Sequence, residues 1–95
     1  MSDETTLHLR ITGRVQGVGY RAWLQQAAQH LKIAGWVRNR RDGTVEAAVR
    51  GAAGDVAHLV KMCHSGPAAA RVTSVERQNG PAGELPMPFE GWPTI

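Results

Sequence analysis

The feature of this sequence that most restricts its fold is a change of hydrophobic period across one glycine-rich segment. Leu7, Leu9 and Ile11 alternate with polar residues, which is the period of a half-buried strand. Beyond residues 13–21, apolar side chains recur at the spacing of a helix, at Leu24, Ala27, Ala28 and Leu31. The sequence therefore predicts a first strand, a tight turn and a helix over Arg21–Lys32.

Two further strands follow this helix. Trp36–Asn39 and Thr44–Arg50 are β-type runs, and the residues between them end in Asp42-Gly43, a strong signal for a hairpin turn. We expect the two runs to form an antiparallel hairpin. Asp42 and Glu46 are expected to shape this hairpin or to balance its charge.

A second helix and a fourth strand complete the pattern. Apolar residues repeat at helical spacing at Val56, Leu59, Val60 and Cys63. This helix should open at Gly54-Asp55 and end before Gly66-Pro67, and Arg71–Arg77 should be the next strand. The order β-α-β-β-α-β is that of the ferredoxin-like α/β sandwich, an α+β fold with a mostly antiparallel sheet and two helices on one face.

The two ends of the chain lack a clear period. Residues 1–6 are acidic and polar, and we expect them to be the flexible N-terminus of a single domain over residues 1–95. Gln78–Ile95 contains four of the five prolines, so it should be mostly irregular, with Phe89 and Trp92 as anchors. The same tail has room for a short edge strand near Phe89.

Composition narrows the class of protein and of ligand. Cys63 is the only cysteine, which excludes an internal disulfide and a Cys-rich zinc site and favours a cytoplasmic protein. The sequence shows no signal-peptide pattern, and no run approaches the ~20 apolar residues of a membrane span. Four histidines show no metal-ligand spacing and are expected near the surface: His8, His30, His58 and His64. The formal net charge is +3, and nine of the eleven basic residues are Arg, which favours planar anions as ligands.

The glycine-rich segment Gly13–Arg21 is expected to cradle an anion. Gly17 and Gly19 allow a tight turn that points consecutive N–H groups inward. The helix that follows adds unpaired N–H groups and the positive end of its dipole, which favour a phosphate or a carboxylate. Arg21 would then close the cradle with a bidentate contact.

The predicted topology adds Asn39 to this cradle. Strand-helix-strand units are almost always right-handed, and they return the second strand parallel to the first with room for another strand between them. The loop after the first strand and the end of the second strand then share one edge of the sheet. Asn39 is therefore expected to lie close to the cradle.

Two segments carry a resemblance to a known family. GRVQGVGYR at residues 13–21 and GWVRNRRDGTVE at residues 35–46 look like the two signature segments of the acylphosphatases, and Gly66–Val72 resembles the GP-x-x-A-x-V segment usual in the family. The resemblance spans roughly residues 7–77. It implies a small hydrolase that splits an acyl phosphate into a carboxylate and inorganic phosphate without a metal or an organic cofactor.

The resemblance also implies site residues and partners. Arg21 matches the family's phosphate-binding arginine, and Asn39 matches the asparagine that orients the attacking water. The phosphate cradle matches the loop residues Gln16, Gly17, Val18, Gly19 and Tyr20. The implied partners are a small acyl phosphate and, as product or inhibitor, inorganic phosphate or another oxyanion. We expect a monomer that binds neither nucleic acid nor a membrane.

The residues leave the proton acceptor to be inferred. The Asn39 amide can hold water but is not basic, so we hypothesise that an oxygen of the substrate's own phosphate takes the proton. Four arginines could ring the edge of the site and attract anionic substrates, although a solvated basic rim without a specific role is the favoured account: Arg14, Arg38, Arg40 and Arg41.

Other functions fit fewer of these features. Gly17, Gly19 and Ala22 with Asp42 also fit a dinucleotide-binding fingerprint, but a hairpin stands where that fold needs further β-α repeats. An RNA-binding module is disfavoured because the first and third strands contain no Phe or Tyr. A non-catalytic anion-binding module and an accessory domain that handles carbamoyl phosphate remain as alternatives.

Overall fold

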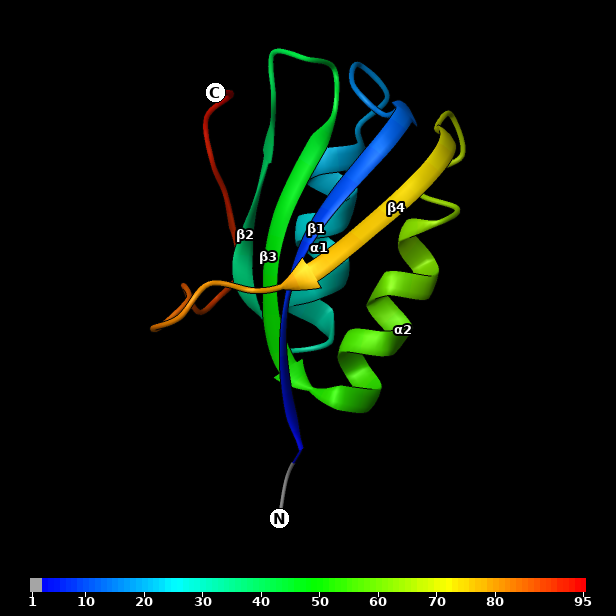
Figure 1. The fold of residues 1–95 in the computed structure, drawn as a ribbon. Helices are drawn as coiled ribbons and strands as arrows, with labels where there is room; N and C mark the ends of the chain where they lie inside the picture. Colours follow the sequence, from blue (N-terminus) through cyan, green and yellow to red (C-terminus); the bar gives the residue numbers. More distant parts are fainter. Residues whose placement is uncertain (1–2) are drawn as a thin grey trace.

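In a computed structural model of the chain, five strands form one sheet and both helices pack on one of its faces (Figure 1). The structure describes residues 3–95. The elements in chain order are β1 (Glu4–Arg14), α1 (Tyr20–His30), β2 (Ala34–Asn39), β3 (Val45–Ala52), α2 (Ala53–Cys63), β4 (Arg71–Asn79) and β5 (Glu90–Gly91). The predicted ferredoxin-like α+β fold is confirmed, with a short fifth strand.

The strand order places two loops at the same end of the sheet. The order is β4-β1-β3-β2-β5, and β3 pairs antiparallel with both β1 and β2. β1 and β2 therefore run parallel with β3 between them. Ile11 and Asn39 both pair with Val45, so the end of β2 lies level with Ile11, near the end of β1 at Arg14. The β1–α1 loop and the β2–β3 hairpin meet at the upper end of Figure 1.

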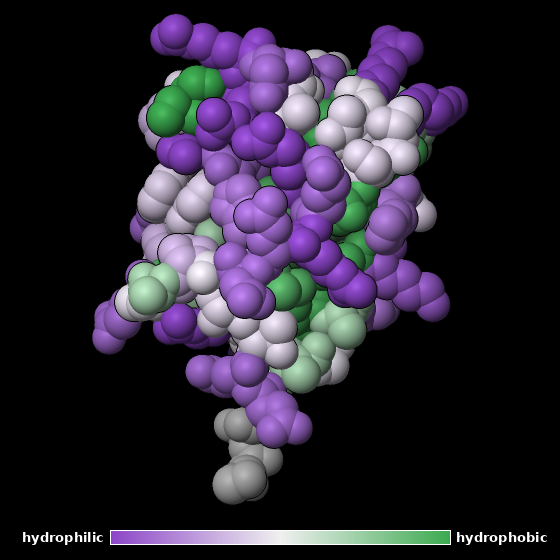
Figure 2. Space-filling model, viewed as in Figure 1, coloured by the Kyte–Doolittle hydropathy of each residue, from purple (hydrophilic) through white to green (hydrophobic). Residues whose placement is uncertain are grey.

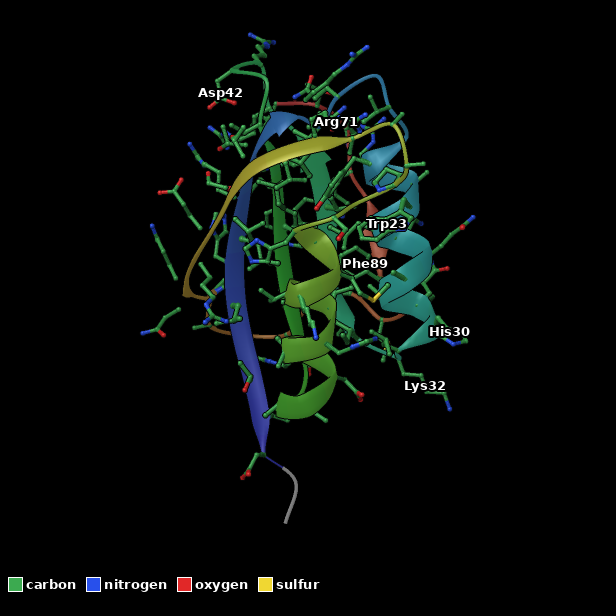
Figure 3. The ribbon with its side chains drawn as sticks, turned by 90° about the vertical axis from the view of Figure 1, so that its right-hand side faces the viewer. Trp23, His30, Lys32, Asp42, Arg71 and Phe89 are labelled. Carbon is green, nitrogen blue, oxygen red and sulfur yellow. The ribbon has the colours of Figure 1, made fainter. Side chains whose placement is uncertain are left out.

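The hydrophobic core lies between the sheet and the helices. Alternate residues of β3 face it, and Val45, Ala47 and Val49 are fully buried. Both helices contribute fully or almost fully buried side chains, namely Leu24, Ala28, Val56 and Leu59. Burial of a Val or Leu side chain stabilises a fold by about 1.5–3 kcal/mol, so this face fixes the helices on the sheet. Figure 3 shows the sheet from its edge, with the helices on one side of it.

The N-terminal strand is longer than the sequence predicted. β1 begins at Glu4, and Glu4–Thr6 pair with Arg50–Ala52 of β3. The expectation of a flexible segment over residues 1–6 is therefore wrong for Glu4–Thr6, while residues 1–2 lie outside the described part of the chain. Polar side chains hide this extension because strand pairing uses backbone groups, which every residue here supplies.

The helix ends also shift slightly. α1 begins one residue earlier than predicted and ends two residues earlier. Lys32 has φ of 58°, in the left-handed region, and this conformation ends the helix before Gly35 is reached. α2 begins at Ala53, one residue before the predicted Gly54.

The C-terminal tail packs along β2, at the opposite edge of the sheet from β4. Phe89 is 1% exposed within the core, and β5 pairs parallel with β2, so the short edge strand expected near Phe89 is present. Trp92 donates its backbone N–H to Val37 O at 2.8 Å. The ring of Trp92 stacks on that of Trp36, with centroids 4.5 Å apart. Figure 1 shows the last residues rising beside β2 toward the hairpin.

The face of the sheet that carries no helix is mainly hydrophilic (Figure 2). Glu46 and Arg50 alternate along β3 with the core residues and point to this face. Neither helix within residues 3–95 is long and apolar enough to cross a membrane.

Candidate active site

A pocket of about 260 Å³ opens between the β1–α1 loop, residues 15–19, and the end of β2. Its lining residues are Val15, Gln16, Gly17, Gly19, Tyr20, Arg21, Ala22 and Asn39. The structure therefore brings Arg21 and Asn39 together with four of the five loop residues predicted to form the cradle. Val18 is the fifth, and it does not line the pocket.

The loop backbone has the geometry that its glycines allow. Gly17 and Gly19 have φ of 73° and 79°, in the left-handed region that costs residues with a Cβ about 1–2 kcal/mol. Gly19 is the N-cap of α1, so no side chain caps this helix, and its first turn contains no acidic residue. The first N–H groups of a helix lack intrahelical acceptors. At the pocket wall these groups supply positive potential for an anion.

Arg21 places a permanent positive charge in this pocket. It lies in the first turn of α1. Its Nη1 donates a hydrogen bond of 3.2 Å to the carbonyl oxygen of Trp92. A guanidinium carries five N–H donors, so this contact leaves capacity for a bidentate bond to an oxyanion. The tail thus holds the arginine while its fork remains available.

Asn39 lines the pocket and carries a buried side-chain acceptor. It is the last residue of β2, and its Oδ1 is buried with no hydrogen-bond partner among residues 3–95. A buried acceptor without a partner costs about 1–3 kcal/mol, which a bound water molecule would recover. The Asn39 backbone is held on one side by pairing with Val45 and on the other by Ile95, whose N–H donates to Asn39 O at 3.1 Å.

The contacts from the tail were not found by sequence reasoning. Trp92 reaches Arg21 and Ile95 reaches Asn39 through main-chain atoms, so neither contact depends on a residue type that could have signalled it. Gln16 was expected only as part of the cradle, but its side chain leaves the loop and contacts the hairpin.

A separate charged cluster lies on the helix-free face around Glu46, whose side chain is 8% exposed. Its Oε1 accepts from Arg38 Nε at 2.7 Å and from Arg40 Nη1 at 3.0 Å, and its Oε2 lies 2.6 Å from His8 Nε2. Burial raises the pKa of Glu46, but these hydrogen bonds and the Arg38 charge outweigh burial and hold the pKa at about 2. Arg38 also lies over Trp36, with its guanidinium carbon 4.8 Å from the ring centroid. Arg38 and Arg40, two of the four arginines considered for a basic rim, therefore have Glu46 as their ion-pair partner.

Other titratable groups near the site have structural partners. Asp42 Oδ1 accepts from the Thr44 hydroxyl and the Thr44 N–H, and these bonds lower the pKa of Asp42. The Tyr20 hydroxyl donates to the Cys63 carbonyl at 2.7 Å, and burial raises the pKa of both the phenol and the Cys63 thiol.

In Figure 3, Asp42 and Arg71 lie at the end of the molecule that holds the hairpin, and His30 and Lys32 lie toward the other end. Within residues 3–95, no three His, Cys, Asp or Glu side chains gather in an arrangement that could hold a metal ion.

Comparisons with known proteins agree on one family. The family model described as acylphosphatase matches residues 7–87. The chain is 54% identical over 76 residues to an acylphosphatase of Nitrobacter hamburgensis, a match that covers 80% of this chain and 77% of that protein. It is 42% identical to an acylphosphatase of a Synechococcus strain over the full length of both chains. The structure of an acylphosphatase from Coxiella burnetii superposes with a TM-score of 0.88 at 30% identity, covering 95% of this chain and 94% of that one.

Proposed function

The chain belongs to the acylphosphatase family, and from this premise we propose how its pocket hydrolyses the carboxyl–phosphate anhydride of small acyl phosphates. The observation that carries the proposal is the meeting of three groups in one pocket. These are the N–H groups of the glycine loop and helix start, the Arg21 guanidinium, and the buried Asn39 Oδ1. The first two suit a phosphate, and the third suits a water molecule.

The phosphate is held by the loop and Arg21. Backbone N–H groups from the segment Gln16–Tyr20 donate to its oxygens, and the Arg21 fork contacts two of them. Phosphoryl transfer passes through a loose transition state whose charge spreads over the equatorial oxygens. Fixed donors placed around those oxygens stabilise that state more than the ground state, and this difference lowers the barrier.

Asn39 directs the attacking water. Its Oδ1 accepts one hydrogen of the water, which turns the oxygen lone pair toward phosphorus. The water oxygen forms a bond to phosphorus, and the bond from phosphorus to the acyl oxygen breaks. The carboxylate leaves with the bonding electron pair and, as a weak base, needs no proton.

The water proton goes to an oxygen of the substrate's own phosphate. Among the lining residues, the amide of Asn39 is not basic and Arg21 stays protonated. The Tyr20 hydroxyl already donates to the Cys63 carbonyl in the core. A pH profile of kcat that follows ionisation of the substrate supports this route, and one that follows an enzyme carboxylate contradicts it.

The pocket's size sets the substrate class. At about 260 Å³ it is smaller than the ~300–1,000 Å³ typical of sites that enclose a drug-sized ligand. It therefore encloses the phosphate and leaves the acyl group outside, so acyl phosphates with different small acyl groups are accepted. We propose that the protein acts as a cytoplasmic monomer on such free metabolites, with inorganic phosphate as product and weak inhibitor.

The test is hydrolysis of acetyl phosphate in the presence of a chelator. We expect Arg21→Ala to lower kcat/KM about 10³-fold or more and to weaken inhibition by inorganic phosphate, as for arginines in related chemistry. Asn39→Ala should lower kcat about 10²-fold with little change in KM, because a misplaced nucleophile costs about that much. Arg77→Ala and Asn79→Ala on the exposed strand β4 are matched controls and should keep wild-type rates. Full activity in folded Arg21→Ala or Asn39→Ala would exclude this mechanism.

A further inference from the structure

The Gln16 side chain joins the two halves of the pocket. It leaves the glycine loop and donates from Nε2 to Arg40 O at 2.7 Å and to Thr44 O at 2.8 Å. Both partners are carbonyl oxygens, which accept only, so the amide nitrogen must face them. Arg40 and Thr44 are the first and last residues of the β2–β3 turn, and Arg40 follows Asn39 directly.

These two bonds are not needed to close the turn. Arg40 N already donates to Thr44 O at 2.9 Å, and Gly43 N donates to Arg40 O at 3.0 Å. The hairpin therefore has its own internal hydrogen bonds. What the Gln16 amide adds is a fixed separation between the hairpin and the phosphate loop, across 24 and 28 residues of sequence.

We propose that Gln16 is a positioning residue that holds the Asn39 water site at its working distance from the phosphate cradle. The inference rests on the proposed function, because it acts through Asn39. Both Nε2 hydrogens are used by the turn carbonyls, so this nitrogen has no donor left for phosphate. Gln16 contributes to anion binding through its backbone N–H alone.

The chemistry makes this separation important. The water and the phosphate are held by different segments of the chain, Asn39 by β2 and the phosphate by the β1–α1 loop. A displacement of one against the other by about 1 Å can lower a rate about 10²-fold, even when binding is unaffected. Within residues 3–95, the Gln16 side chain joins the phosphate loop directly to the turn that follows Asn39.

The variant Gln16→Met tests the proposal. Methionine has a similar length and volume but no donor, and the turn carbonyls keep their internal hydrogen bonds, so the variant should fold. We expect kcat for acetyl phosphate to fall about 10- to 100-fold, with KM and the Kd for inorganic phosphate within about threefold of wild type. Gln26→Met on the exposed side of α1 is the matched control and should change none of these values.

A double-mutant cycle separates positioning from a general structural effect. If Gln16 acts through Asn39, Gln16→Met should cost less than about twofold in kcat when Asn39 is already Ala. In the wild-type background, NMR resonances of the Asn39 side-chain amide and of backbone 40–44 should shift in Gln16→Met and stay in place in Gln26→Met. Additive losses, an unchanged kcat or unchanged hairpin resonances would each overturn the proposal.

The outcomes also distinguish this inference from the proposed mechanism. If Arg21→Ala or Asn39→Ala keeps full activity, the proposed mechanism fails, and a role for Gln16 acting through Asn39 fails with it. If Asn39→Ala is impaired while Gln16→Met has the wild-type kcat, the mechanism stands and only the role of Gln16 is rejected.

Discussion

The cluster around Glu46 makes a quantitative prediction about acid stability. Glu46→Gln keeps the shape of the side chain but removes the charge that faces His8, Arg38 and Arg40. The pKa of Glu46 is about 2 in the folded chain against an ordinary value of 4.5. That difference corresponds to about 3 kcal/mol of preference for the charged form in the folded state.

The expected loss of unfolding free energy at pH 7 is somewhat smaller than about 3 kcal/mol. Arg38 and Arg40 are partly exposed, with 21% and 31% of their side-chain surface accessible, so water screens part of the attraction. The neutral amide introduced by the substitution would also retain weaker hydrogen bonds. We therefore expect Glu46→Gln to lower the free energy of unfolding by about 2–3 kcal/mol at pH 7.

The sign of the pH dependence follows from the lowered pKa. A carboxyl with a depressed folded-state pKa adds stability that is complete above its unfolded pKa and is lost as pH falls toward the folded value. The difference in free energy of unfolding between wild type and Glu46→Gln should therefore narrow as the pH falls from about 5 to about 2. At pH 3 less than about half of it should remain.

Urea unfolding followed by circular dichroism at pH 7 and pH 3 measures this gap. Glu76→Gln is the matched control, because Glu76 is exposed and shares the partner Arg10 with Glu46 in the sheet register. It should change the free energy of unfolding by less than about 0.5 kcal/mol. A Glu46→Gln variant as stable as wild type at pH 7, or one with the same loss of stability at both pH values, would contradict a stabilising charge on Glu46.

Three further predictions concern other parts of the fold. Gly19→Ala should lower the free energy of unfolding by about 1–2 kcal/mol, because φ at this position is 79°. Gly54→Ala within α2 should raise the free energy of unfolding by about 0.5–1 kcal/mol. Urea unfolding of the two variants measures both changes. Trp92→Ala should lower the free energy of unfolding by about 1–2 kcal/mol through the lost stack on Trp36, and an unchanged thermal midpoint would contradict this. A thiol reagent at pH 8 should label Cys63 only after unfolding, because the residue is fully buried and burial raises its pKa to about 11; rapid labelling of the folded chain would show the burial to be wrong.

Much of the fold could be predicted because two separate features of the sequence mark each element. The apolar period of each element and the glycines between elements point to the same boundaries, and the chirality of strand-helix-strand units then fixes the parallel return of β2. That single rule predicted Asn39 beside the cradle, and the shared partner Val45 places Asn39 level with Ile11, near the end of β1.

The parts that could not be predicted depend on backbone pairing. Glu4–Thr6 join β1 although their side chains show no alternation, because β3 supplies partners for their main-chain groups. A short edge strand near Phe89 was expected, but β5 contains only two residues, so no period could mark its bounds or its parallel pairing with β2. The tail around Trp92 was expected to be irregular, and its contact with Arg21 uses a carbonyl that any residue would carry.

Contacts to main-chain groups also explain how so few side chains can define this pocket. The Arg21 side chain donates a hydrogen bond to the carbonyl oxygen of Trp92. The Gln16 side chain donates to the carbonyl oxygens of Arg40 and Thr44. Main-chain acceptors are present whatever side chain a position bears, so substitutions at positions 40, 44 and 92 can preserve these contacts. Loss of the guanidinium or the amide cannot be made good in this way. The constraint on the sequence therefore falls on Arg21, Gln16 and the glycines of the loop, while the segments that hold them in place can vary.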